Sequence, residues 1–157
     1  FDPIGGYRHP DHIHIHEATK LAFDLAGDAA FERDLPPYQP RKLYYHTIPK
    51  RFIRFAINLL RLLGKDPRRW GRNEDIDLTQ LMVNFPTHAQ INYRMVAKRK
   101  EAASLCHASQ IGPTITGGAF RWVFRLFGFG SKDIFIKASP APPPDSKKIE
   151  KDLFEGI

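Results

Sequence analysis

Apolar residues recur at helical spacing near the start of the chain, over residues 11–25. They lie three or four positions apart, which places them on one face of a helix: Ile15, Ala18, Leu21, Ala22 and Leu25. We expect Asp11 to cap this helix, because its carboxylate can accept hydrogen bonds from the first free backbone N–H groups. Gly27 is suited to end the helix, and residues 1–10 are expected to form a loop.

A strand and a second helix are expected in the middle of the chain. Residues 43–48 are rich in aromatic and β-branched side chains, which predicts a strand. Pro49 is suited to end that strand and to open a helix over 50–63, which Gly64 would end. We expect the large apolar side chains of this helix to pack together against the rest of the fold: Phe52, Phe55, Leu59 and Leu62.

The second half of the chain predicts further helices and strands. A short strand is expected at 75–79, a long helix over 89–108, an aromatic helix over 119–127 and a final strand over 133–138. The apolar stripe of the long helix would be formed by Ile91, Met95, Ala102, Leu105 and Cys106. Cys106 is therefore expected to be an inert, buried thiol.

This mixture of strands and helices indicates an α/β layer architecture. Residues 1–138 are expected to belong to one domain, and residues 139–157 to form a proline-rich C-terminal arm. The chain has 157 residues and opens without an initiator Met on a loop-like run. We therefore expect it to be part of a longer protein.

The net charge of +7 could attract nucleic acid or anionic lipid. However, no block of five like charges occurs in the chain. We expect neither nucleic acid nor a membrane surface as a partner, and we expect a more acidic segment elsewhere in the protein. The oligomeric state is left open, and a homo-oligomer is compatible with the sequence.

The single cysteine, Cys106, excludes an intrachain disulfide and a cysteine-rich zinc site. It is compatible with a reducing compartment, and we expect a cytoplasmic protein. The longest apolar stretch, residues 52–63, is interrupted by two arginines and is shorter than the roughly 20 residues that a membrane span needs.

Four of the seven histidines lie within eight residues: His9, His12, His14 and His16. Imidazole is a common zinc ligand, and two histidines four positions apart share a helix face. Asp11 is placed to accept an N–H from one of the rings and fix its tautomer. A solvated helix end or an expression tag is the alternative interpretation of the cluster, but the irregular spacing and the Pro10–Asp11 interruption speak against a tag.

A catalytic zinc ion usually has three protein ligands and one open position. This segment offers His12 as a convincing ligand, with His16 or His9 as further possibilities, and no clear carboxylate in a ligand position. The remaining ligands should therefore come from elsewhere.

The run Gly-Gly-Tyr-Arg-His-Pro-Asp-His at residues 5–12 resembles the second signature motif of the PIG-L/LmbE zinc-dependent N-deacetylases, which commonly reads Tyr-Gly-His-Pro-Asp-His. Arg8 stands where that motif usually has Gly. The run from Lys100 to Gln110 resembles a later Lys-x-x-Ala-x-x-x-His-x-Ser-Gln helix of the same family. The resemblance covers roughly residues 1–138. It implies a Rossmann-like three-layer sandwich, of which this chain is the C-terminal part.

The resemblance also implies roles for four residues. His12 matches the histidine that ligates zinc, and His9 matches a catalytic histidine that stabilises the oxyanion or protonates the leaving amine. Asp11 matches the acid that orients and tunes that histidine. Tyr7 matches a mobile tyrosine that contacts the substrate near the scissile amide. His16 has no role that transfers, and we expect it either to support the metal ligands from behind or to be structural.

The family's first motif, Ala-His-Pro-Asp-Asp, is absent from this chain. In the family that motif supplies two more zinc ligands and the general base, so we expect an N-terminal segment of the same protein to complete the site. The implied reaction is zinc-dependent hydrolysis of an N-acetyl group, on a small N-acetylglucosamine-type sugar conjugate.

Two alternative functions differ in class from one another. One is an amidase of the same family that acts on a thiol conjugate or a non-sugar acyl amine. The other is a catalytically incomplete module that binds a membrane or a partner through the basic, aromatic segments 50–63 and 119–127. Lys100 and His107 share one helix face, where solvent exposure is the default and a contact with the substrate pocket is the alternative.

Overall fold

The computed structural model describes the chain in four stretches, residues 1–32, 34–71, 74–107 and 131–157. These residues form two compact units. The first unit comprises the described residues within 1–47, 85–89 and 134–157, and the second comprises those within 48–84 and 90–133. The predicted aromatic helix at 119–127 lies outside the described residues.

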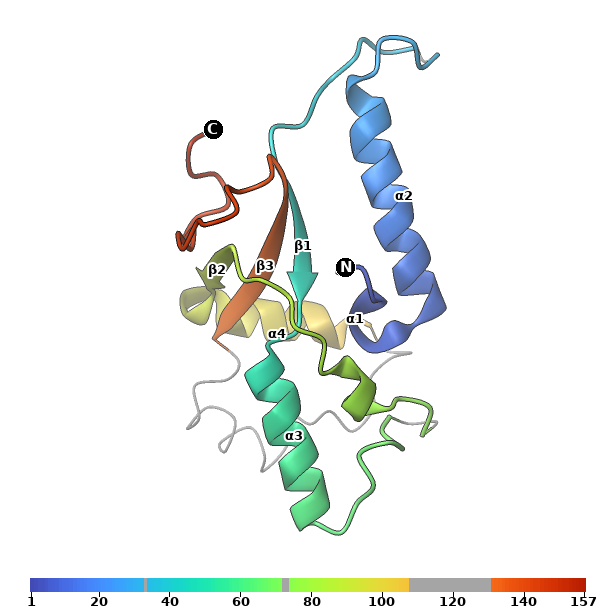
Figure 1. Cartoon of the computed structure of the whole chain (residues 1–157), viewed down its shortest axis with the longest axis vertical. Coiled ribbons are helices and arrows are strands. Elements are labelled where there is room, and N and C mark those ends of the chain that lie inside the picture. Colours follow the sequence, from blue (N-terminus) through green and yellow to red (C-terminus); the bar gives the residue numbers. More distant parts are fainter. Residues whose placement is uncertain (33, 72–73, 108–130) are drawn as a thin grey trace. The chain divides into compact units, whose positions relative to one another are not determined.

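Two helices in direct contact open the first unit (Figure 1). Helix α1 covers Gly5–Arg8 and helix α2 covers Pro10–Gly27. The prediction of a helix over 11–25 is confirmed, whereas the prediction of a loop over the whole of 1–10 is wrong because of α1.

The N-cap of α2 is His9 rather than Asp11. Pro10 occupies the first helical position, where its missing N–H costs nothing. The next backbone N–H, that of Asp11, is bonded to His9 Nδ1 at 3.2 Å. The proline therefore shifts the cap two residues toward the N-terminus from the position that the sequence pattern favoured.

No residue of α2 is buried. Ile15 and Leu21, which the periodicity placed on a core face, are 53% and 59% exposed. A helix with an uncovered apolar face loses most of the free energy that burial would contribute, about 25 cal/mol for each Å² of apolar surface. The described part of the chain leaves Ile15 and Leu21 largely uncovered.

The described strands form one small sheet. Strand β1, Leu43–Thr47, pairs antiparallel with β3, Lys132–Ser139, and Thr47 lies opposite Ile134. The strand order is β1-β3-β2, with β2 spanning Ala89–Asn92. The strands predicted at 43–48 and 133–138 are confirmed, and the combination of helices with a sheet confirms the α/β class at this coarse level.

The prediction of one long helix over 89–108 is wrong for its first half. That half contains β2 and a 3₁₀ turn, η2, at Arg94–Val96, and only α4, Ala97–Leu105, is α-helical. Hydrogen bonds flanking β2 fix it as a strand: His88 N–H donates to Phe135 at 2.9 Å, and Tyr93 N–H donates to Ser131 at 3.0 Å. Tertiary pairing overrides the local helical pattern here.

Cys106, which the same pattern placed in a core stripe, is exposed. No residue of α4 is buried, so the helix offers no covered face to which the thiol could belong. The prediction of an inert core thiol is therefore wrong.

The second unit has an apolar core between α3, Lys50–Leu62, and η1, Leu78–Leu81. The helix predicted at 50–63 is confirmed, and Gly64 follows it with a φ of +69°. The buried side chains are Ile53, Ala56, Ile57, Leu60, Leu78 and Leu81.

The buried face of α3 differs from the predicted one. Its branched and small residues are buried, whereas the phenylalanines are not. Leu62, expected in the core, is 83% exposed. The turn η1 overlaps the strand predicted at 75–79, so that prediction is wrong. Asp77 caps η1, accepting the Thr79 N–H at 2.9 Å, and such local bonds favour a turn over a strand. No helix among the described residues is long and apolar enough to cross a membrane.

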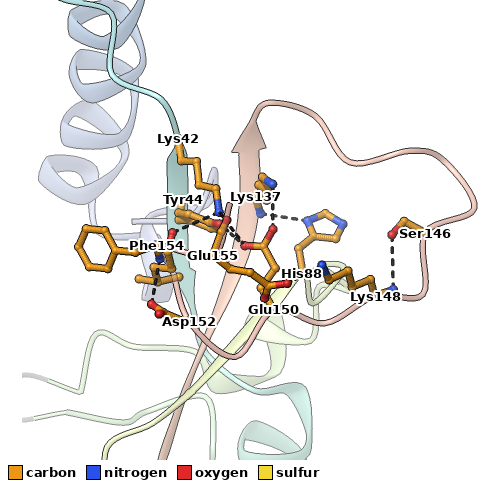
Figure 2. A network of polar contacts seen from close by, with 11 residues as sticks. Lys42, Tyr44, His88, Lys137, Ser146, Lys148, Glu150, Asp152, Phe154 and Glu155 are labelled. Carbon is orange, nitrogen blue, oxygen red and sulfur yellow. Dashed lines mark hydrogen bonds and ion pairs between the residues drawn. The ribbon is translucent and has the colours of Figure 1, made fainter. Parts of the chain in front are cut away.

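The C-terminal tail is tied to the sheet of the first unit by Glu150 (Figure 2). Its carboxylate accepts from Lys137 Nζ at 2.9 Å, from Lys42 Nζ at 3.5 Å and from the Tyr44 hydroxyl. Its backbone N–H donates to the His88 carbonyl at 2.9 Å. The side chains of Glu150, Lys42 and Lys137 are only 9–14% exposed.

This setting changes the acidity of two of the groups. Burial alone would raise the pKa of Glu150, but the hydrogen bonds from Lys137 and Tyr44 and the charges of Lys137 and Lys42 outweigh it and lower the pKa to about 2. Burial, followed by the bond to Glu150, raises the pKa of Tyr44 to about 12. The tail is thus held by one ionised carboxylate between two cations.

Replacing Glu150 by Gln should lower the free energy of unfolding by about 2–3 kcal/mol at neutral pH, because two buried ammonium groups lose their counter-charge. The folded-state pKa of Glu150 lies below its ordinary value of 4.5, so its contribution is present above pH 4.5 and lost as the pH falls toward about 2. Urea unfolding of both proteins across this range should show the difference shrinking with acidity.

Glu155→Gln is the matched control, since that carboxylate pairs with the exposed Lys148. Its loss should cost no more than about 1 kcal/mol. Equal losses of unfolding free energy in the two variants would show that the Glu150 network stabilises the fold no more than an exposed ion pair does.

Candidate functional site

The site begins with a buried carboxylate ahead of the histidine cluster. Asp2 is 2% exposed and Thr47, at the end of β1, is 4% exposed. Asp2 Oδ2 accepts from the Thr47 hydroxyl at 2.8 Å, and Oδ1 accepts from the Gly6 N–H at 2.9 Å. The carboxylate therefore ties the loop before α2 to the sheet.

The chain between Asp2 and α2 takes an unusual path. Gly5, Gly6 and Arg8 all have positive φ angles, of 66°, 69° and 64°. A Cβ on Gly5 would lie 2.9 Å from the side chain and backbone nitrogen of Ile13. Only glycine fits there without a shift of the start of α2.

The position of Arg8 explains the glycine that the family motif usually has at this point. A left-handed conformation is free for glycine and strained for a residue with a Cβ. The departure from the motif thus carries a local backbone cost while the turn itself is kept.

His12 is held by this turn. Its Nδ1 lies 3.2 Å from the Gly5 carbonyl oxygen, and the Phe1 ring stacks on the imidazole with centroids 3.9 Å apart. A carbonyl oxygen can only accept, so His12 Nδ1 must carry the proton. In the neutral ring Nε2 is then the unprotonated nitrogen, which is the form that binds a metal.

Three predicted site residues lie together at the start of α2. The rings of Tyr7 and His12 meet edge to face at 4.8 Å, those of His9 and His12 lie 5.1 Å apart, and those of Tyr7 and His9 lie 5.8 Å apart. The turn through α1 therefore gathers a phenol and two imidazoles on one side of the helix start.

Asp11 is the least engaged of the predicted site residues. Its side chain is 83% exposed and its carboxylate lies 3.8 Å from His9 Nδ1, which is too far for a hydrogen bond. That ring nitrogen instead accepts the Asp11 backbone N–H. A backbone N–H can only donate, so the neutral His9 ring carries its proton on Nε2.

His16 has a structural environment in this structure. Its Nδ1 lies 3.0 Å from the Phe1 carbonyl, and its ring packs on Tyr45 of β1 with centroids 4.4 Å apart. His16 thereby holds Phe1, whose ring stacks on His12. These contacts agree with the structural role expected for it.

The residues present fit one part of a zinc site. Within the described ranges, no three His, Cys, Asp or Glu side chains come together in a way that could hold a metal ion. His12 presents one imidazole whose Nδ1 is bonded to the Gly5 carbonyl, and the His9 ring lies 5.1 Å from it. The described residues therefore do not form a three-ligand zinc site by themselves.

The second family-like segment is anchored within its own unit. Lys100 of α4 pairs with Asp133 at 2.6 Å, and its ammonium lies 3.8 Å from the centre of the Tyr93 ring. Burial and then the charge of Asp133 raise the pKa of Tyr93. Lys100 thus has a structural partner, whereas residues 108–110 of this motif lie outside the described residues.

Sequence reasoning overlooked Asp2, Thr47 and Phe1. The available signal for Asp2 was an Asp-Pro pair before two glycines, a composition typical of turns in which the aspartate accepts backbone N–H groups. Its partner Thr47 lies 45 residues away, and no local pattern could have indicated that contact.

Several curated proteins that share one name are similar to this chain. A protein of Geodermatophilus obscurus named 1D-myo-inositol 2-acetamido-2-deoxy-alpha-D-glucopyranoside deacetylase is 34% identical over 121 residues, covering 76% of this chain and 40% of the relative. Proteins of the same name from Streptomyces avermitilis and Rhodococcus jostii are 32% and 28% identical, and each alignment covers 100% of this chain.

These relatives match the PIG-L/LmbE deacetylase family, which the runs at residues 5–12 and 100–110 resemble. The chain spans about half the length of the curated relatives it matches, between 40% and 53% of the three named here. No protein-family model matches the chain.

Replacing Arg8 by Gly should raise the free energy of unfolding by up to about 1 kcal/mol, because the strain of a left-handed Arg exceeds the added freedom of the unfolded chain. Arg54→Gly, at an exposed interior position of α3, is the control and should lower it by a similar amount, since glycine is unfavourable within a helix. Denaturant titration measures both. Destabilisation by Arg8→Gly of the same size as the control would contradict the strained turn.

Proposed function

We propose that this chain is the C-terminal half of a zinc-dependent N-deacetylase with a Rossmann-like three-layer domain. Its substrate is an N-acetylglucosamine-type sugar conjugate. The observation that carries the proposal is the grouping of Tyr7, His9 and His12 at the start of α2, with His12 held as the tautomer that binds a metal. The names of the relatives support the choice of an acetamido sugar linked to inositol.

His12 would hold the zinc ion through Nε2, and a segment N-terminal to Phe1 would contribute the other ligands and the general base. When bound, zinc would polarise the amide carbonyl and lower the pKa of a coordinated water toward about 7. The incomplete donor set around His12 and the match to half of each relative both support a site shared between two segments.

His9 would act on the oxygen of the scissile amide and on the leaving nitrogen. Its Nε2–H is the free donor of the neutral ring, because Nδ1 accepts the Asp11 N–H. Tyr7 supplies a second donor beside it. Donors aimed at a developing oxyanion typically contribute about 100- to 1000-fold in rate.

Asp11 would stabilise His9 when both of its ring nitrogens are protonated. When His9 gains a proton at Nδ1, that nitrogen can no longer accept the Asp11 N–H, and the nearest acceptor is the Asp11 carboxylate, 3.8 Å away in this structure. A small movement of the exposed carboxylate would then stabilise the imidazolium that donates to the departing amine. The products are acetate and a free amino sugar.

Three histidine variants of the complete protein test this assignment. His12→Ala should lose bound zinc and activity together, whereas His9→Ala should keep zinc and lose about 100- to 1000-fold in kcat on an N-acetylglucosaminyl inositol. His14→Ala is the matched control, because His14 lies on the same helix with its side chain 79% exposed, and it should change neither quantity.

Zinc content by atomic emission and acetate release measure the two effects. Unchanged zinc stoichiometry and affinity in His12→Ala would remove His12 from the site. Loss of zinc in His9→Ala would make His9 a ligand instead of an acid, and an unaffected rate in that variant would remove its catalytic role.

A further inference from the structure

The buried carboxylate of Asp2 has no role in the chemistry proposed above. A charged group at 2% exposure costs several kcal/mol of desolvation unless hydrogen bonds compensate for it. Asp2 has such bonds on both oxygens, one from the loop at Gly6 and one from Thr47 on β1. It therefore acts as a rigid bridge between the sheet and the turn that precedes α2.

This bridge fixes the backbone of the turn at the point that faces His12. The Gly6 N–H bonded to Asp2 belongs to the same peptide group as the Gly5 carbonyl that accepts from His12 Nδ1. The Gly5 N–H donates to the Asp2 carbonyl at 2.9 Å, so both peptide groups of Gly5 are held by Asp2. The direction of the Gly5 carbonyl follows from these bonds.

The tautomer of His12 depends on that carbonyl. A histidine ring nitrogen that is bonded to an acceptor carries the proton, and the other ring nitrogen is then unprotonated. If the Gly5 peptide turned away, Nδ1–H would lose its acceptor, and the proton would redistribute between the two nitrogens. Nε2 would then be available to a metal for only part of the time.

We propose that Asp2 is a positioning residue for His12: through the Gly5–Gly6 peptide it holds the imidazole with Nδ1 protonated and Nε2 free to bind zinc. The proposal rests on the ligand role proposed for His12, but its first consequence, the tautomer, is measured without zinc or turnover. Thr47 supports Asp2 from the strand side.

The tautomer of His12 is read from long-range ¹H–¹⁵N correlations of the imidazole in this chain labelled with ¹⁵N-histidine. The starting protein should show Nδ1–H. Asp2→Ala should give a mixture of tautomers or mainly Nε2–H. In the complete protein the same variant should bind zinc about 10- to 100-fold more weakly, the usual effect of removing a group that orients a metal ligand.

Two further variants separate positioning from simple loss of structure. Asp2→Asn should largely restore both readouts, because its amide oxygen can accept the Gly6 N–H while its NH₂ donates to Thr47 Oγ1. Thr47→Val removes only the bond to Oδ2, so it should shift the tautomer in the same direction by less, and it decides the matter if Asp2→Ala does not fold.

Asp77→Ala is the matched control. Asp77 also accepts a backbone N–H and a threonine hydroxyl, both from Thr79, but it caps η1 in the other unit. It should lower stability and leave the His12 tautomer and zinc affinity unchanged. An unchanged tautomer in both Asp2→Ala and Thr47→Val would overturn the proposal even if His12 proves to be a ligand, as would an equal effect of Asp77→Ala.

Discussion

The hydrogen bond between His12 Nδ1 and the Gly5 carbonyl is the interaction on which the site depends. A histidine in water exchanges its proton between two nitrogens, whereas a metal needs one of them free at a fixed place. Here the acceptor is a backbone oxygen whose direction is set by two left-handed glycines and a buried aspartate. The residues around His12 therefore hold its ring so that Nε2 is left unprotonated.

The rest of the first unit is consistent with this constraint. Phe1 stacks on the face of His12, His16 holds the carbonyl of Phe1, and Tyr45 packs on His16. Strand β1 supplies Tyr45 and Thr47, and its pairing with β3 holds both in register. The histidine cluster thus contains residues of different kinds: His12 presents a free nitrogen, His9 caps the helix, and His16 belongs to the scaffold.

Much of this was predictable from local sequence patterns, and the failures have a common physical origin. The helices at 10–27 and 50–62 and the strands at 43–47 and 132–139 follow from periodicity, from proline and glycine positions and from β-branched residues. Residues 89–92 instead form a strand because the flanking N–H groups of His88 and Tyr93 bond to Phe135 and Ser131, and partners so far along the chain leave no local signal.

Two further differences have the same cause. The exposed Cys106 and the uncovered face of α2 were placed in a core by spacing alone, which reports that residues share a helix face but not whether anything covers it. The motif itself identified Tyr7, His9 and His12 as neighbours, since they lie within six positions around a helix start. Asp2 could not be found in that way, because its function depends on Thr47 across the fold.

We infer that this chain holds one ligand of a zinc site that another segment completes. Isothermal titration of zinc into the isolated 157-residue chain tests this inference. One imidazole cannot replace a three-ligand site, so we expect weak binding that His12→Ala reduces further, together with no hydrolysis of an N-acetylglucosamine derivative. Tight stoichiometric zinc binding with turnover by the isolated chain would contradict it, because the site would then be complete within these residues.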